Sequence, residues 1–354
     1  MKRIRVLVVD DSVVIRRMLR DVLASDPAME VVGAAANGTI ALAMLEQCSP
    51  DAVTLDVEMP GMDGIEVLRK IRDKHRALPV IMFSTLTERG AAATLDALAA
   101  GASDYVTKPA NVGSVSVAMD RVREDLVGKI KALCDCAITL PRPVTGTKLQ
   151  AVRLARSAPY EVVAIGCSTG GPNALSEILP QLPADFPVPV VIVQHMPPTF
   201  TRFLAERLNM SCNLSVHEAG MDQLLEPGHI WIAPGDFHIS TYISGTHVRL
   251  RTHQGPPENS CRPAVDVLFR SVAKTYGRRA LAVVLTGMGQ DGLRGAEMLK
   301  EAGSSVIAQD EATSIVWGMP GFVAQAGLAD KVVPLPQIAQ EITRRIATHR
   351  LAYA

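Results

Sequence analysis

Short apolar segments rich in β-branched residues alternate with helix-type segments along two long stretches of this chain, and this alternation constrains the fold most strongly. The first stretch holds five apolar segments, separated by runs rich in Leu, Ala, Arg and Glu such as 12–24 and 88–100. Nearly continuous apolar strands are typical of a parallel sheet buried on both faces. We therefore expect an α/β domain of (βα)₅ order with helices on both faces. The predicted strands are residues 6–9, 31–35, 52–55, 80–83 and 105–106.

A segment of different composition, residues 129–158, interrupts the alternation. Pro141, Pro143 and Gly146 lie there among several Thr, Lys and Arg residues, which indicates a linker. The sequence thus predicts two doubly wound α/β domains, residues 1–128 and 159–350, the second mostly parallel with a β-hairpin around residues 243–246. The strands expected in the second domain are 161–165, 188–193, 229–233, 281–286 and 305–308, and the hairpin segments are 237–242 and 247–251.

Charge and composition exclude several classes of protein. The 354 residues include 36 Lys or Arg and 36 Asp or Glu, and this zero formal charge argues against a nucleic-acid-binding domain. No apolar stretch approaches the about 18 residues that span a bilayer, so we expect no membrane insertion. The six cysteines lack metal-ligand spacing, as expected for reduced thiols in a cytoplasmic protein.

Carboxylates follow two strands of the first domain. Asp10 and Asp11 follow the first strand and Asp56 ends the third, so all three converge at the carboxyl edge of the sheet, where ligands bind in this architecture. Mutual repulsion makes such a cluster costly unless a cation lies among the oxygens, and hard oxygen ligands suit Mg²⁺. Ser84 offers a hydroxyl after the fourth strand. Lys108 offers a positive charge after the fifth, and we expect a cis bond to the proline that follows it.

The second domain begins with a candidate nucleophile. Gly166-Cys167-Ser168-Thr169-Gly170 satisfies the G-x-S-x-G pattern, and it follows a predicted strand and precedes a helix opened by Pro172. The glycines permit a sharp turn that exposes the serine hydroxyl. Backbone N–H groups at the helix start can face a developing oxyanion. By local sequence alone, a glycine-rich loop that binds a phosphate or a dinucleotide is the alternative.

Two further residues follow strands of the same predicted sheet. His195 lies just after residues 188–193, and Asp291 follows residues 281–286. Together with Ser168 they leave one edge of one sheet, where active sites of this architecture form. The chain order Ser, His, Asp differs from that of α/β-hydrolases, but a triad is defined by geometry and not by order.

Residues 1–128 resemble a response-regulator receiver domain. The resemblance implies that Asp56 accepts a phosphoryl group from a histidine kinase and that the three carboxylates described above hold Mg²⁺. It also implies that Lys108 and Ser84 contact the phosphoryl oxygens and that Tyr105 moves with the switch.

The second half resembles the CheB-type chemotaxis protein-glutamate methylesterases, and the receiver–linker–esterase order agrees. The resemblance implies Ser168 as nucleophile, His195 as general base and then acid, and Asp291 as the residue that orients the histidine. Oxyanion donors would be the backbone N–H groups of Thr169 and Met288. The matching segments are IGCSTGGP (165–172), QHMP (194–197), IAPGD (232–236), CRPAVD (261–266) and LTGMGQDG (285–292).

The family further implies the substrate and the regulation. The substrates would be glutamyl methyl esters and certain glutamines of methyl-accepting chemotaxis receptors. The catalytic domain would need no cofactor, and the enzyme would be a monomer. Phosphorylation of the receiver domain would activate it. Two alternatives stay open on sequence alone. One is a non-catalytic response regulator that binds a nucleotide or a protein through its Gly-rich loop, and the other is a degenerate esterase that keeps the fold without activity.

Overall fold

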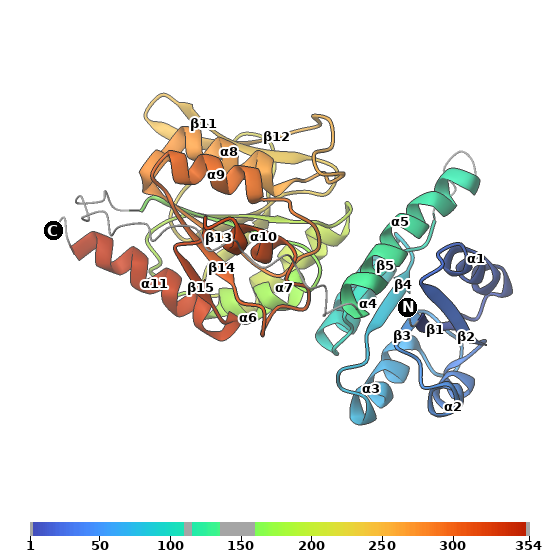
Figure 1. The fold of residues 1–354 in the computed structure, drawn as a ribbon. Helices are drawn as coiled ribbons and strands as arrows, with labels where there is room; N and C mark the ends of the chain where they lie inside the picture. Colours follow the sequence, from blue (N-terminus) through green and yellow to red (C-terminus); the bar gives the residue numbers. More distant parts are fainter. Residues whose placement is uncertain (1–2, 110–114, 135–159, 352–354) are drawn as a thin grey trace. The chain divides into compact units, whose positions relative to one another are not determined.

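The computed structural model describes residues 3–109, 115–134 and 160–351 and divides into two compact units, Met1–Ile138 and Thr139–Ala354 (Figure 1). Helix α5, Val115–Cys134, runs through the first residues of the predicted linker, and residues 135–158 lie outside the described part. Among the described helices, none is both long and apolar enough to cross a membrane. The two units are taken separately below.

The first unit is the predicted (βα)₅ domain. All neighbouring strands are parallel, in the order β2-β1-β3-β4-β5. Three consecutive strands, β1, β3 and β4, are almost wholly buried, as their apolar sequences predict. The strands are β1 Ile4–Val9, β2 Met29–Ala35, β3 Ala52–Asp56, β4 Val80–Ser84 and β5 Asp104–Thr107, and the other helices are α1 Val13–Ala24, α2 Gly38–Cys48, α3 Gly64–Lys74 and α4 Glu88–Ala99.

Polar side chains fix where the helices of this unit begin. Ser12, Asn37, Asp63 and Thr87 each cap a helix, because the side-chain oxygen accepts a hydrogen bond from a backbone N–H of the first turn. Caps of this kind are typically worth about 1 kcal/mol each. They end the loops that leave the carboxyl edge of the sheet, where Asp56 also lies.

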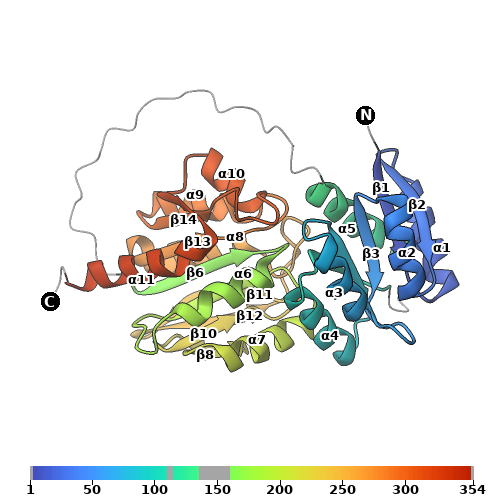
Figure 2. The same cartoon turned by 90° about the horizontal axis from the view of Figure 1, so that it is seen from below.

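The second unit is built on a parallel sheet of seven strands, in the order β15-β14-β13-β6-β7-β10-β8. Helix α8 packs against α9 and β11 (Figure 1), whereas α6 packs against α7 and α11 (Figure 2). A separate antiparallel sheet has the order β11-β12-β9. The large-sheet strands are β6 Val162–Cys167, β7 Val190–Gln194, β8 Ser215–Glu218, β10 His229–Ile232, β13 Ala280–Val284, β14 Ser305–Gln309 and β15 Lys331–Val333; those of the small sheet are β9 Gln223–Leu224, β11 His238–Ser244 and β12 His247–His253. The helices are α6 Gly171–Ile178, α7 Phe200–Ser211, α8 Val265–Tyr276, α9 Leu293–Glu301, α10 Met319–Gln325 and α11 Leu335–Leu351.

The predicted hairpin is present, but its loop is shorter than expected. Pairing of β11 with β12 continues to Ser244 opposite His247, so only Gly245 and Thr246 form the turn. Gly245 has φ +61°, a conformation that glycine adopts without cost. A second expectation was wrong: within the described residues the cis peptide bond is Arg262–Pro263, and Lys108–Pro109 is trans.

Candidate functional site

The carboxylate cluster of the first unit gathers around one lysine. Lys108 Nζ lies 3.0 Å from Asp10 Oδ2 and 2.8 Å from Asp56 Oδ2. Oxygens of Asp10, Asp11 and Asp56 lie within 4.8 Å of one another. Burial raises the pKa of Asp56 to about 6; the Asp10 charge adds to this rise and Lys108 opposes it. The site therefore holds more negative charge than one ammonium group neutralises.

The residues at this cluster fit a magnesium ion. All three side chains supply hard carboxylate oxygens, two of them, Asp10 and Asp56, almost fully buried. Asp11 is exposed, which leaves one side open to water and to a phosphoryl group. Mg²⁺ usually keeps several waters and takes only one or two carboxylates directly, and this arrangement allows both.

Two other candidate residues of the first unit connect the strand ends to the helices. The buried Ser84 hydroxyl donates to Gly90 O at 3.1 Å, the first turn of α4. Tyr105 is buried, and Lys129 of α5 donates to its carbonyl at 2.7 Å while lying 5.2 Å from its ring centre. Ser84 therefore connects the end of β4 to α4, and Tyr105 connects β5 to α5.

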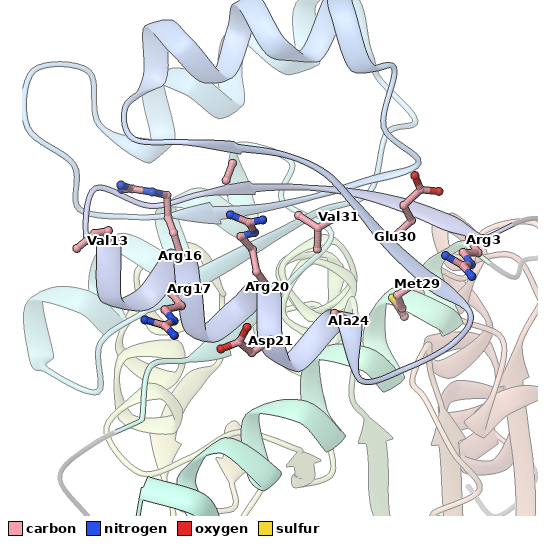
Figure 3. A pocket seen from close by; sticks show the side chains of 11 residues that line it. Arg3, Val13, Arg16, Arg17, Arg20, Asp21, Ala24, Met29, Glu30 and Val31 are labelled. Carbon is pink, nitrogen blue, oxygen red and sulfur yellow. The ribbon is translucent and has the colours of Figure 1, made fainter.

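A groove with a volume of about 820 Å³ lies along α1 and the edge strand β2 (Figure 3). Arg3, Arg16, Arg17 and Arg20 all line it, against two acids. Arg16 Nη1 also donates to the carbonyl oxygens of residues 10 and 11, at 2.7 and 2.9 Å, which connects the groove to the carboxylate cluster. Over the described residues, neither Arg17 nor Arg20 forms an ion pair, so their charges face solvent.

In the second unit, Ser168 stands at the end of the central strand β6. Its backbone N–H donates to Thr286 O at 3.0 Å. Gly170 has φ +77° and begins α6, and a Cβ on Gly171 would approach Gln194 Oε1 to 1.9 Å. The two glycines are therefore required by the sharp turn that carries the serine.

His195 and Asp291 follow the two strands that flank β6. The sheet order β13-β6-β7 places them on either side of Ser168, and His195 N donates to Cys167 O at 3.2 Å. His195 Nε2 lies 2.7 Å from Asp291 Oδ2. The three predicted residues thus meet at one edge, with an ion pair or hydrogen bond already formed between two of them.

Asp291 is held by an unusually complete set of donors. Besides the imidazole, its Oδ2 accepts from Val265 N at 2.6 Å, and its Oδ1 accepts from Asp266 N and Gly292 N, both at 3.0 Å. Asn259 Nδ2 adds a bond of 2.8 Å to Oδ1. Two of these amides open α8, where a helix favours negative charge.

This environment sets the charges of the pair. Burial by itself would raise the pKa of Asp291, but hydrogen bonds from His195 and from the backbone N–H groups hold it below its usual value. Burial lowers the pKa of His195, yet contacts with Asp291 and Cys261 outweigh it and raise that pKa to about 10. Both shifts favour the imidazolium–carboxylate form of the pair over the neutral form.

The same chain matches two protein-family models over the parts just described. The response regulator receiver domain matches residues 6–119, and the CheB methylesterase matches residues 163–342, half of the chain. The chain belongs to the CheB methylesterase family. It is an enzyme, a carboxylic ester hydrolase of the protein-glutamate methylesterase type, and it carries the receiver domain of a two-component response regulator.

Relatives align with this CheB family member over their whole length. A protein of Trichodesmium erythraeum named protein-glutamate methylesterase/protein-glutamine glutaminase is 52% identical over 98% of this chain and 100% of its own. One of the same name from a Nocardioides species is 54% identical over 99% and 97%. The crystal structure of the Thermotoga maritima CheB methylesterase catalytic domain is similar at 43% identity and a TM-score of 0.52, covering 52% of this chain and 98% of that one.

The catalytic domain of this CheB family member contains site residues that the sequence did not indicate. Cys261 Sγ lies 3.6 Å from His195 Nδ1, and Asn259 contacts Asp291. Cys261 is the first residue of the CRPAVD segment, whose match to the family gives the cysteine no role. Asn259 lies two positions before this segment. Within the described residues no hydrogen bond joins the Ser168 hydroxyl to His195.

Proposed function

We propose that the chain hydrolyses γ-glutamyl methyl esters, and deamidates glutamines, on methyl-accepting chemotaxis receptors. Phosphorylation of Asp56 by a histidine kinase would raise the rate. The observation that carries the catalytic part is the His195–Asp291 contact of 2.7 Å beside the Ser168 turn. The receiver domain and its lysine-bridged carboxylates support the regulatory part.

In the first step Ser168 Oγ attacks the ester carbonyl while His195 Nδ1 takes its proton. Nε2 keeps its hydrogen because Asp291 accepts it, which leaves Nδ1 as the basic nitrogen. The tetrahedral intermediate then expels methoxide, which takes the proton from the imidazolium and leaves as methanol. A glutamyl ester of Ser168 remains.

In the second step water attacks that ester and the same proton transfers repeat, releasing glutamate and the free serine. A glutamine substrate follows the same course with ammonia as the leaving group. The backbone N–H groups of Thr169 and Met288 are the proposed oxyanion donors. Met288 N donates to no acceptor within the described residues, and each such donor is typically worth about 3 kcal/mol in the transition state.

In the receiver domain, Asp10, Asp11 and Asp56 are the proposed holders of Mg²⁺, which would neutralise charge on the incoming phosphoryl group. Lys108 would move from bridging two carboxylates to contacting a phosphoryl oxygen. Ser84 would contact another, and its release from Gly90 would shift the start of α4.

Asp56→Asn tests this regulation. The variant should keep the unstimulated rate of methanol release from methylated receptor fragments and lose all stimulation by a small phosphodonor with Mg²⁺, because an amide cannot form the acyl phosphate. Asp73→Asn, an exposed carboxylate of α3, is the matched control and should respond like wild type. Stimulation that persists in Asp56→Asn would exclude this residue as the acceptor.

The arginine groove supplies a surface for the kinase. Four arginines line it and it joins the carboxylate cluster at Arg16, so it complements a donor domain that brings an anionic phosphohistidine to Asp56. Charges at the rim of an interface act mainly on the association rate. We therefore expect the groove to affect phosphorylation of Asp56 by a kinase and not phosphorylation by a small phosphodonor.

Reversing two of these charges, Arg17→Glu with Arg20→Glu, should slow phosphorylation by the kinase about tenfold at low salt, with a smaller effect at high salt. Phosphorylation by a small phosphodonor should be unchanged, since the carboxylate cluster is intact. Arg76→Glu changes an exposed arginine elsewhere in the domain and controls for net charge. Equal slowing with both donors would contradict a docking role.

A further inference from the structure

A tight turn carries two side chains into the catalytic site. Glu258 N donates to Cys261 O at 3.0 Å, and Cys261 N donates to Glu258 O at 2.8 Å. The two central residues, Asn259 and Ser260, have φ of +52° and +61°, the pattern of a type I′ turn. Residues with a Cβ adopt this region rarely and at an energetic cost, and such strain gathers at functional sites.

Contacts on both sides hold this turn in place. The Arg270 guanidinium binds both carboxylate oxygens of Glu258, with Nη2 2.6 Å from Oε2. Asn259 Nδ2 bridges Asp291 Oδ1 at 2.8 Å and Asp266 Oδ2 at 2.9 Å. These contacts fix the position of the last side chain in the turn, the Cys261 thiol.

The thiol of Cys261 lies 3.6 Å from Nδ1 of His195, within reach of a sulfur hydrogen bond. Nδ1 is also the nitrogen that must accept the Ser168 proton, because Nε2 is occupied by Asp291. We propose that Cys261 is a positioning residue that holds His195 by Nδ1 in the resting enzyme, so that the thiol and the Ser168 hydroxyl compete for one nitrogen. This inference rests on the proposed role of His195 as general base.

The charges around the imidazole agree with a resting hold. The contact with Cys261 is one of the interactions that outweigh burial and raise the pKa of His195, after the hydrogen bond that His195 donates to Asp291. The raised pKa favours the protonated imidazolium, which cannot accept a proton from serine. Within the described part of the chain, the charged and titratable groups that face His195 or surround the turn include Asp291, Cys261, Asp266, Glu258, Arg270, Asp236, Arg262 and His238.

Two substitutions remove the contact in different ways. Cys261→Ala removes the sulfur, and Cys261→Ser keeps a small polar side chain whose shorter bond to Cβ holds the oxygen farther from Nδ1. Both should move the acid limb of the kcat/KM profile to lower pH by about one unit, which is about a tenfold rise in neutral imidazole at a fixed pH below the limb. Activity at neutral pH should rise by a similar factor.

The measurement is methanol release from methylated receptor fragments by the full-length chain between pH 6 and 10. Cys212→Ser, a half-buried cysteine at the end of α7, should leave the limb where it is. A lower rate with an unmoved limb in both Cys261 variants would overturn the proposal and leave the cysteine a packing role. Activity that survives in Ser168→Ala or His195→Ala would instead refute the proposed mechanism itself.

The pKa of His195 can also be measured directly, without the methanol-release assay. In the Ser168→Ala background, NMR titration of the His195 imidazole should give a lower pKa when Cys261 is also replaced by serine. An identical His195 pKa with and without the Cys261 thiol would exclude the proposed positioning contact. A fall in that pKa without any change in the rate profile would show that the contact exists but does not compete with the serine, which also contradicts the proposal.

Discussion

Replacing Ser168 with alanine is expected to lower kcat for methyl-ester hydrolysis by at least about 10⁴-fold, the size typical of removing a triad nucleophile. Without Oγ no acyl-enzyme forms, and only binding and the oxyanion donors remain. Deamidation should fall in the same proportion because both reactions share the acylation step. Methanol and ammonia release, measured at saturating substrate, check both losses.

Ser168→Ala should remove activity with little effect on the stability of the fold. The Ser168 hydroxyl makes no hydrogen bond among the described residues, so its loss should change the free energy of unfolding by less than about 0.5 kcal/mol. Phosphorylation of Asp56 should be unchanged. Ser176→Ala, an exposed serine on α6 whose hydroxyl donates to Pro172 O, is the matched control and should keep full activity. Substantial hydrolysis by Ser168→Ala would transfer the nucleophile to another residue.

The large parallel sheets could be predicted because their strands are buried on both faces and read as apolar runs. Short strands at the margins could not. The strands Ser215–Glu218, Gln223–Leu224 and Lys331–Val333 have few or mixed apolar residues, and they form because a neighbour offers free backbone groups. The hairpin loop was predicted too long, since Ile243 and Ser244 stay paired despite their exposure.

The clustering of candidate site residues followed from the same logic. Residues at the carboxyl ends of adjacent parallel strands must converge, so Asp10 and Asp56 meet in one unit, and His195 and Asp291 in the other. Which nitrogen of a histidine faces an acid is a matter of side-chain geometry, and no sequence pattern supplies it.

The turn at residues 258–261 could not be predicted from the positions of the strand ends. Its two central residues hold positive φ without glycine, so no turn pattern marks it. Its contacts reach His195, 66 positions away, and Asp291, 32 positions away. Only the folded chain brings an ordinary cysteine beside the general base, which is why Cys261 looked like a plain reduced thiol.

The loss expected for Asp291→Asn is nearly as large, about 10⁴-fold in kcat/KM. The carboxylate accepts from His195, from three backbone N–H groups and from Asn259, all of them donors. An asparagine offers one oxygen and one NH₂ group, so at least one donor must face another donor. If the amide turns its NH₂ to the imidazole, Nε2 becomes the acceptor and Nδ1 carries the hydrogen. That tautomer cannot take a proton from Ser168.

The sign of the accompanying pH effect follows from the lost charge. The Asp291 carboxylate raises the pKa of His195, so its removal should lower that pKa and move the acid limb of the residual rate to lower pH. The rate on the plateau should still stay low, because orientation and not protonation is then limiting. Asp185→Asn, an exposed carboxylate of the same domain, should show neither change. A residual plateau within tenfold of wild type would mean that the charge of Asp291 is not needed to hold the imidazole in its working position.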